Sequence, residues 1–127
     1  YYLIKPLNCD SLPDLFHSLC LELRERAASD YLRGMGASGL GVEAAARTAA
    51  VLSTGAEGAI PLKEGYAAAM AAQNTSYACV EKNIRSMVGK LQAGACGEYQ
   101  ALMGGLPAER PSNELFLRRL ARRILEW

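Results

Sequence analysis

The chain has 127 residues, half of them hydrophobic, and its 14 basic and 13 acidic side chains leave a net charge of +1. This length fits one domain with a sizeable core, and so small a net charge gives no support of its own to nucleic-acid binding. Because alanine is frequent and β-branched residues are sparse, we expect an all-α protein. No apolar run could span a bilayer and no signal peptide is recognisable, so we also expect a soluble, cytoplasmic protein.

The first residues predict a short strand, because Tyr1–Pro6 is an apolar, aromatic run that ends in a Lys-Pro pair. One strand cannot form a sheet, so these residues look like the severed end of another domain. Asp10 or Ser11 then caps a predicted helix that continues to Met35. The apolar positions in the first half of this helix are Leu12, Leu15, Phe16, Leu19 and Leu23.

Four glycines are expected to end this helix and to form a loop: Gly34, Gly36, Gly39 and Gly41. A glycine-rich loop can bind phosphate, but here no strand precedes it and no Lys-Ser or Lys-Thr pair follows it. We therefore interpret it as a flexible connection.

Further along the chain, the apolar periodicity predicts a helix over residues 42–52 and an alanine-rich helix from about Leu62. A polar break at residues 74–76 separates the latter from a helix over 76–93, and a short helix follows over 98–103. Ser112 or Asn113 caps the last helix, which is expected to bury Leu115, Phe116, Leu120, Ile124 and Trp127. The sequence thus predicts about six helices.

The two helices on either side of the break at residues 74–76 have the pattern of a helix-turn-helix that binds DNA. The second helix has a predicted buried stripe, formed by Tyr77, Val80, Ile84, Met87 and Leu91. Its opposite face has short or hydrogen-bonding side chains and two cations: Ser76, Cys79, Lys82, Arg85 and Ser86. Such a helix fits a major groove. The pattern taken alone favours an ordinary amphipathic hairpin, because this spacing often arises by accident.

Charge is distributed unevenly along the chain. Residues 1–74 contain six basic and eight acidic side chains, a net charge of −2, whereas residues 75–127 contain eight and five, a net charge of +3. The positive part includes four arginines on the last helix: Arg118, Arg119, Arg122 and Arg123. They suit either contacts with DNA phosphates or a solvated face, and Arg119 and Arg123 are the pair that we assign to phosphates.

The sequence gives little support to a metal site or to catalysis. The cysteines Cys9, Cys20, Cys79 and Cys96 are scattered, and His17 is the one histidine, so no zinc site is predicted. An even number of cysteines would allow disulfides, but a helical domain without a secretion signal favours reduced thiols. Without an activated nucleophile or paired carboxylates, we expect neither an enzyme nor a cofactor.

Two segments resemble the effector domain of the master response regulators that start sporulation in endospore-forming bacteria. The first is Asn74-Thr75-Ser76, followed by Val80-Glu81-Lys82, by Ile84-Arg85 and later by Met103-Gly104. The second is Arg110-Pro111-Ser112-Asn113 leading into Phe116. The resemblance is collinear over about residues 24–125. Ile4-Lys5-Pro6 also looks like the last strand of a response-regulator receiver domain, so residues 1–23 would be the end of a receiver and residues 24–127 the helical effector domain.

This resemblance implies that Glu81, Lys82 and Arg85 contact bases, with Thr75 and Ser76 near the DNA backbone. Cys79 stands where the family has an arginine, Lys82 replaces another arginine, and Gln73 takes the place of an aromatic residue. Lysine offers a point charge in place of a bidentate fork, so the DNA specificity should be weaker or shifted. The family's tyrosine-rich second helix is reduced here to residues 43–47.

The sequence therefore predicts a sequence-specific transcription factor domain that binds double-stranded DNA through residues 76–93. The resemblance adds regulation of sporulation-type genes, a homodimer on DNA and a contact between residues 97–105 and the sigma subunit of RNA polymerase. The alternative is a helical module that dimerises or docks a partner and has lost specific DNA binding. The near-neutral charge and Cys79 favour the alternative, whereas the arginines of the last helix favour DNA binding.

Overall fold

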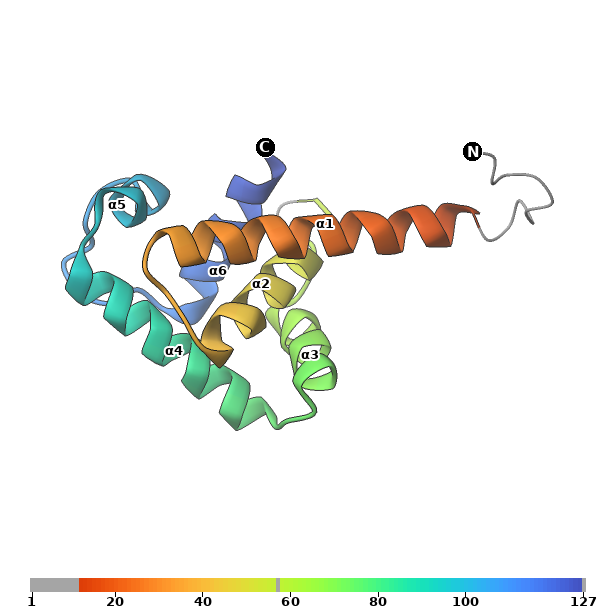
Figure 1. The fold of residues 1–127 in the computed structure, drawn as a ribbon, viewed down its shortest axis with the longest axis horizontal. Coiled ribbons are helices and arrows are strands. Elements are labelled where there is room, and N and C mark those ends of the chain that lie inside the picture. Colours follow the sequence, from red (N-terminus) through yellow and green to blue (C-terminus); the bar gives the residue numbers. More distant parts are fainter. Residues whose placement is uncertain (1–11, 57, 127) are drawn as a thin grey trace.

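Residues 12–56 and 58–126 form six α-helices and no strand in the computed structural model (Figure 1). The helices are α1 (Leu12–Gly34), α2 (Leu40–Leu52), α3 (Leu62–Gln73), α4 (Tyr77–Gly94), α5 (Gly97–Met103) and α6 (Asn113–Leu125). The prediction of an all-α protein with about six helices is confirmed for these residues. The predicted strand at residues 1–6, the predicted cap at Asp10 or Ser11 and the predicted burial of Trp127 lie outside the described residues.

Helix α2 lies at the centre of the fold and contacts α1, α3, α4 and α6. Five of its buried residues are alanines, whose small side chains let the neighbouring helices approach closely. At the contact with α3, the Thr48 hydroxyl donates a hydrogen bond of 3.3 Å to the Gly65 carbonyl oxygen. A Cβ on Gly65 would lie 2.6 Å from Cγ2 of Thr48, so glycine is the residue that fits here.

The glycine-rich stretch between the first two helices differs from the prediction at one position. Gly36 and Gly39 have φ values of 97° and 87°, so they form the expected turn with a backbone conformation that favours glycine. Gly41, however, lies inside α2 and is buried. A Cβ on Gly41 would lie 2.6 Å from the carbonyl oxygen of Asn83 in α4, so its role is close helix packing.

The core faces of α4 and α6 follow the predicted periodicity, with two exceptions. Tyr77, the first residue of α4, is 49% exposed, and its ring meets the Tyr66 ring at 70° with centroids 5.2 Å apart. Leu115 is 46% exposed, because the buried stripe of α6 includes Leu117 and leaves Leu115 to one side. The predicted core residues Val80, Ile84, Met87, Leu91, Phe116, Leu120 and Ile124 are all buried.

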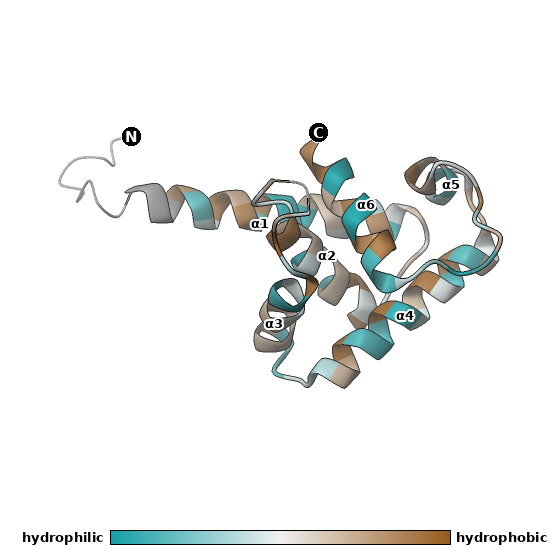
Figure 2. Cartoon of the chain, turned by 180° about the vertical axis from the view of Figure 1, so that it is seen from behind, coloured by the Kyte–Doolittle hydropathy of each residue, from teal (hydrophilic) through white to brown (hydrophobic). Residues whose placement is uncertain are grey.

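The two halves of α1 differ in their surroundings. Ala28 and Leu32 belong to the core, whereas Phe16, Leu19 and Leu23 are 69%, 50% and 56% exposed. The first half extends beyond the other helices, and apolar residues recur along it (Figures 1 and 2). The predicted domain boundary between residues 23 and 24 falls within this continuous helix, near the change from exposed to buried residues.

Candidate functional site

The turn between α3 and α4 spans only three residues and has a well-defined geometry. Asn74 ends α3 in the left-handed conformation, with φ 51° and ψ 54°, which asparagine adopts more readily than most residues. The backbone N–H groups of Asn74 and Thr75 both donate to the Met70 carbonyl oxygen. Ser76 then caps α4, because its Oγ accepts a hydrogen bond of 3.2 Å from the Cys79 backbone N–H. These bonds hold the start of α4 at a defined angle to α3.

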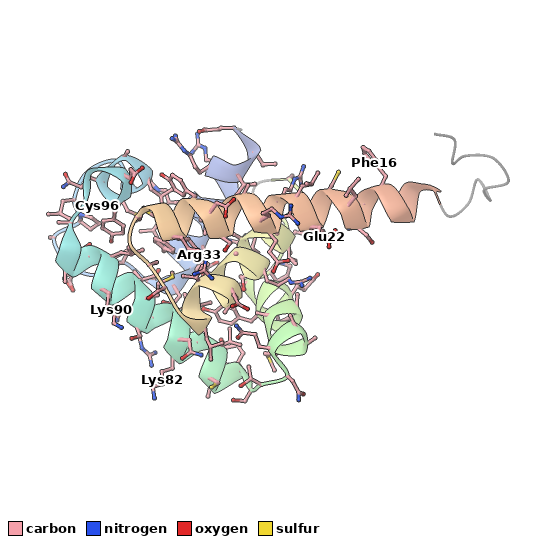
Figure 3. All side chains as sticks on the ribbon, viewed as in Figure 1. Phe16, Glu22, Arg33, Lys82, Lys90 and Cys96 are labelled. Carbon is pink, nitrogen blue, oxygen red and sulfur yellow. The ribbon has the colours of Figure 1, made fainter. Side chains whose placement is uncertain are left out.

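The side of α4 opposite the core carries exposed side chains, which we call the exposed face of α4: Cys79, Lys82, Arg85 and Ser86. The spacings of three and four residues place these side chains along one side of the helix. Lys82 points away from the other helices, as does Lys90 two turns further along (Figure 3). Thr75 and Ser76 directly precede α4 and so lie at the N-terminal end of this face. Ser76 is exposed and Thr75 is half-buried.

Glu81 and Arg85 form an ion pair on one edge of the exposed face. Arg85 Nη1 lies 3.3 Å from Glu81 Oε1, and the two side chains are 45% and 41% exposed. An exposed pair of this kind contributes only about 0–1 kcal/mol, so either side chain can turn to another partner at small cost. The structure therefore leaves both groups available for contacts outside the protein.

The backbone carbonyl group of Glu81 is linked to α6 and α3 by hydrogen bonds through Asn113. Asn113 Nδ2 donates to the Glu81 carbonyl oxygen and to the Tyr66 hydroxyl oxygen, both at 3.1 Å. Tyr66 is 1% exposed, and burial raises the pKa of its hydroxyl, although the hydrogen bond from Asn113 lowers it. These contacts join the starts of α4 and α6 through one side chain.

The loop between α5 and α6 packs against the same edge of α4. Gln92 Nε2 donates a hydrogen bond of 2.7 Å to the Pro107 carbonyl oxygen. Arg110 Cδ lies 3.5 Å from where a Cβ on Gly89 would be, so the exposed Arg110 side chain passes over α4 at Gly89. The sequence pattern did not single out Arg110 as a site residue, because only the folding of this loop brings it to α4.

The other edge of α4 borders a cavity of about 410 Å³ formed with residues 35–41. On the α4 side its walls include Asn83, Ser86 and Lys90, and the half-buried Cys96 also lines it. Gln73 Nε2 donates a hydrogen bond of 3.0 Å to the Leu40 carbonyl oxygen and so ties α3 to the start of α2.

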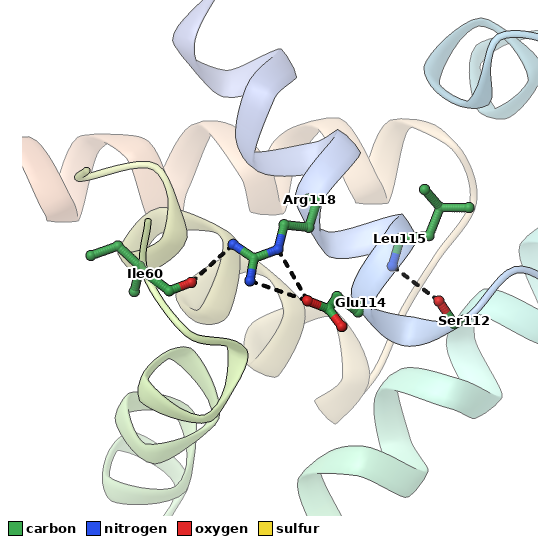
Figure 4. A network of polar contacts seen from close by, with 5 residues as sticks. All are labelled: Ile60, Ser112, Glu114, Leu115 and Arg118. Atoms are coloured by element: carbon green, nitrogen blue, oxygen red, sulfur yellow. Dashed lines mark hydrogen bonds and ion pairs between the residues drawn. The ribbon is translucent and has the colours of Figure 1, made fainter. Parts of the chain in front are cut away.

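The four arginines of α6 do not form one uniform surface. Arg118 is turned inward: its Nη1 donates a hydrogen bond of 2.9 Å to the Ile60 carbonyl oxygen, and its Nη2 lies 3.2 Å from Glu114 Oε2 (Figure 4). The guanidinium carbon of Arg123 lies 5.6 Å from the centroid of the Tyr31 ring. Arg119, Arg122 and Arg123 line a shallow groove of about 250 Å³ beside α5.

The structure thus brings together the predicted site residues at 75–86 but places Arg119 and Arg123 apart from them. In the two opposite views of Figures 1 and 2, the C-terminal end of α6 and the α3–α4 turn lie on opposite sides of α1.

The described part of the chain contains no group of three or more His, Cys, Asp or Glu side chains placed to hold a metal ion. Cys20, Cys79 and Cys96 are free thiols, and Cys9 lies outside the described residues. Among the helices formed by residues 12–56 and 58–126, none is both long and apolar enough to cross a membrane.

Comparisons with protein-family models, with curated proteins and with solved structures find no match for this chain.

Proposed function

We propose that this chain is a sequence-specific DNA-binding domain in which α3, the turn and α4 act as a helix-turn-helix. In this proposal α4 enters the major groove of double-stranded DNA. The observation that carries the proposal is the contrast between the two sides of α4. One side is buried in the core, and the other exposes Lys82 and Arg85 among side chains short enough to let the helix approach base edges.

Each residue of the exposed face has a chemical role in this proposal. Lys82 and Arg85 donate hydrogen bonds to guanine edges, and Glu81 accepts one from cytosine. The hydroxyls of Thr75 and Ser76 contact phosphates at the start of α4. Cys79 and Ser86 are small and allow close approach to the bases. Arg119 and Arg123 remain proposed phosphate contacts where the duplex extends past α4.

The resemblance to the sporulation response regulators supports a more specific role for the domain. By analogy with that family, the chain would be the effector part of a two-component regulator, bind its DNA site as a homodimer and regulate sporulation-type genes. Residues 97–105, which comprise α5 and the two glycines after it, would contact the sigma subunit of RNA polymerase. These residues are joined to the proposed DNA-binding surface by the short stretch of chain that follows the end of α4.

Selection of bound duplexes from a random pool tests this function directly. We expect an enriched sequence, and we expect Lys82→Ala and Arg85→Ala each to weaken binding to it by about 1–3 kcal/mol and to relax its base preference. Arg26→Ala is a matched control, because it removes one exposed charge from α1, away from α4. If no sequence is enriched, or if both α4 variants bind every duplex like the wild type, the proposed function is wrong.

A second candidate function is dimerisation or partner docking without DNA binding. The exposed apolar residues Phe16, Leu19 and Leu23 on the extended half of α1 favour it, because such a stripe is stabilised by burial against another surface. Sedimentation of the wild type and of a Leu19→Glu, Leu23→Glu double variant distinguishes the two functions. A docking module predicts an oligomer that the double variant dissociates, together with no selected DNA sequence.

A further inference from the structure

Two exposed cations that the proposed function does not use lie on either side of the exposed face of α4. Arg110 reaches α4 from the α5–α6 loop and passes over Gly89. Lys90 belongs to α4 itself and lines the cavity on the opposite edge. Among the described residues, neither cation takes part in an ion pair. Both positive charges are therefore open to an anion from outside the chain.

The positions of the two cations are related to each other. Gly89 and Lys90 are consecutive, so Arg110 and Lys90 lie at the same level along the helix axis. Successive residues of a helix are rotated by about 100°. Lys82 and Ser86 occupy the middle of the exposed face, with Gly89 on the Arg85 side of it and Lys90 on the Asn83 side. Gly89 and Lys90 are seven and eight residues beyond Lys82, so the two cations lie about two turns further along α4 than Lys82, on either side of the middle of the exposed face.

The edge with Arg110 is also held in place. Gln92 fixes the loop through Pro107, and Pro111, which follows Arg110, is buried. Asn113 then binds the backbone of Glu81, so the loop is attached to α4 on both sides of Arg110. A cation on an anchored backbone loses less conformational freedom when it binds than one on a mobile loop.

We propose that Lys90 and Arg110 bind backbone phosphates of the two different strands of the duplex, one on each wall of the major groove. This inference rests on the proposed function, because it requires α4 to lie in the groove. An α-helix with its side chains is about 10–12 Å wide and the major groove about 12 Å wide, so the edges of an inserted helix face the two rows of phosphates. The two cations fix the depth and rotation of α4, and base preference stays with Lys82 and Arg85.

Salt dependence of binding tests the phosphate contacts. On the selected duplex we expect Lys90→Gln and Arg110→Gln each to reduce the slope of log K against log salt concentration by about one unit, and the double variant by about two. The base preference of all three variants should remain that of the wild type. Arg26→Gln removes the same charge from α1 and should leave the slope unchanged, which controls for the change in net charge.

Neutral methylphosphonate groups, introduced one at a time into each strand, test the arrangement on two strands. A methylphosphonate at the position contacted by Lys90 should weaken wild-type binding but have no further effect on Lys90→Gln. The position that behaves in this way for Arg110→Gln should be on the other strand. Thermal unfolding of each variant checks that the fold is retained.

The possible failures are distinct. If Lys90→Gln and Arg110→Gln have the slope of Arg26→Gln while Lys82→Ala still changes base preference, the phosphate contacts are wrong and the proposed function stands. If both variants map to one strand, the arrangement across the groove is wrong. If the wild-type protein selects no sequence, the proposed function fails and this inference fails with it.

Discussion

Gly41 of α2 packs directly on the backbone of Asn83 in α4, so that a Cβ on Gly41 would lie 2.6 Å from the Asn83 carbonyl oxygen. The same Cβ would lie 3.1 Å from Cβ of Met87. Both neighbours belong to a helix whose other side is exposed to solvent. Close packing at Gly41 therefore sets the position of α4, which carries the candidate DNA-binding residues.

We expect Gly41→Ala to lower the free energy of unfolding by about 1–3 kcal/mol, because the added methyl group meets backbone that cannot move without displacing α4. The gain in helix propensity, about 0.5–1 kcal/mol, offsets part of this cost. Urea denaturation followed by circular dichroism measures the difference. Gly34→Ala is the matched control, since a Cβ there meets nothing within 4 Å, and it should be neutral or slightly stabilising. Equal stability of the two variants would contradict the assigned role of Gly41.

The parts of the fold that depend on local sequence could be predicted. Apolar residues at spacings of three and four identified the buried side of α4 through Val80, Ile84 and Met87. Ser112, one of two residues predicted as a cap, does cap α6, because its side chain accepts a hydrogen bond from the Leu115 N–H. These features follow from the geometry of a single helix, so a short window of sequence is sufficient to show them.

Features that depend on contacts between distant segments could not be predicted. Gly41 looked like a loop residue, because its close neighbour Asn83 is more than forty positions away. The sequence placed Arg110 only in a segment of family resemblance, and its position over Gly89 results from the path of the α5–α6 loop. Arg118 belongs to the same run of arginines in the sequence as the others of α6, and its hydrogen bond to the Ile60 carbonyl oxygen joins it to a segment 58 positions away.

The stability of the protein should fall at alkaline pH because of its buried tyrosines. Burial raises the pKa of Tyr66 above its ordinary value of 10.0, and also raises the pKa of Tyr99. Below pH 10 both the folded and the unfolded state keep these protons. As the pH rises above 10, the unfolded state releases them first, so the free energy of unfolding decreases.

Urea denaturation between pH 8 and 11.5 measures this decrease for the wild type and for Tyr66→Phe. The variant loses the hydrogen bond with Asn113 and should be less stable at every pH. Its stability should nevertheless fall less steeply above pH 10, because one raised tyrosine pKa has been removed. Parallel curves for the two proteins would show that Tyr66 does not contribute to the alkaline loss of stability.

Arg118 should contribute to stability in a way that its neighbour Arg119 does not. Its guanidinium group joins α6 to the segment before α3 through the Ile60 carbonyl oxygen, and its side chain is only 24% exposed. Hydrogen bonds to charged groups contribute about 1.5–3 kcal/mol, so we expect Arg118→Gln to lower the free energy of unfolding by about that amount. Arg119→Gln, at an exposed position, should change it by less than about 0.5 kcal/mol. Chemical denaturation of the two variants gives the comparison.

Arg119 and Arg123 provide the last prediction, which concerns how far the bound duplex extends. If they bind phosphates, changing both to Gln should weaken binding to all sequences alike and reduce the salt slope by about one unit per lost contact. Base preference should stay unchanged, because phosphates carry no direct sequence information. The Arg123 guanidinium also packs over the Tyr31 ring, and its Nη1 lies 3.6 Å from Glu126 Oε1. Thermal unfolding must therefore first show that the double variant is folded. An unaltered salt slope would assign this end of α6 to a solvated face or to a partner protein, and would confine the DNA contacts to the side of the molecule formed by α4.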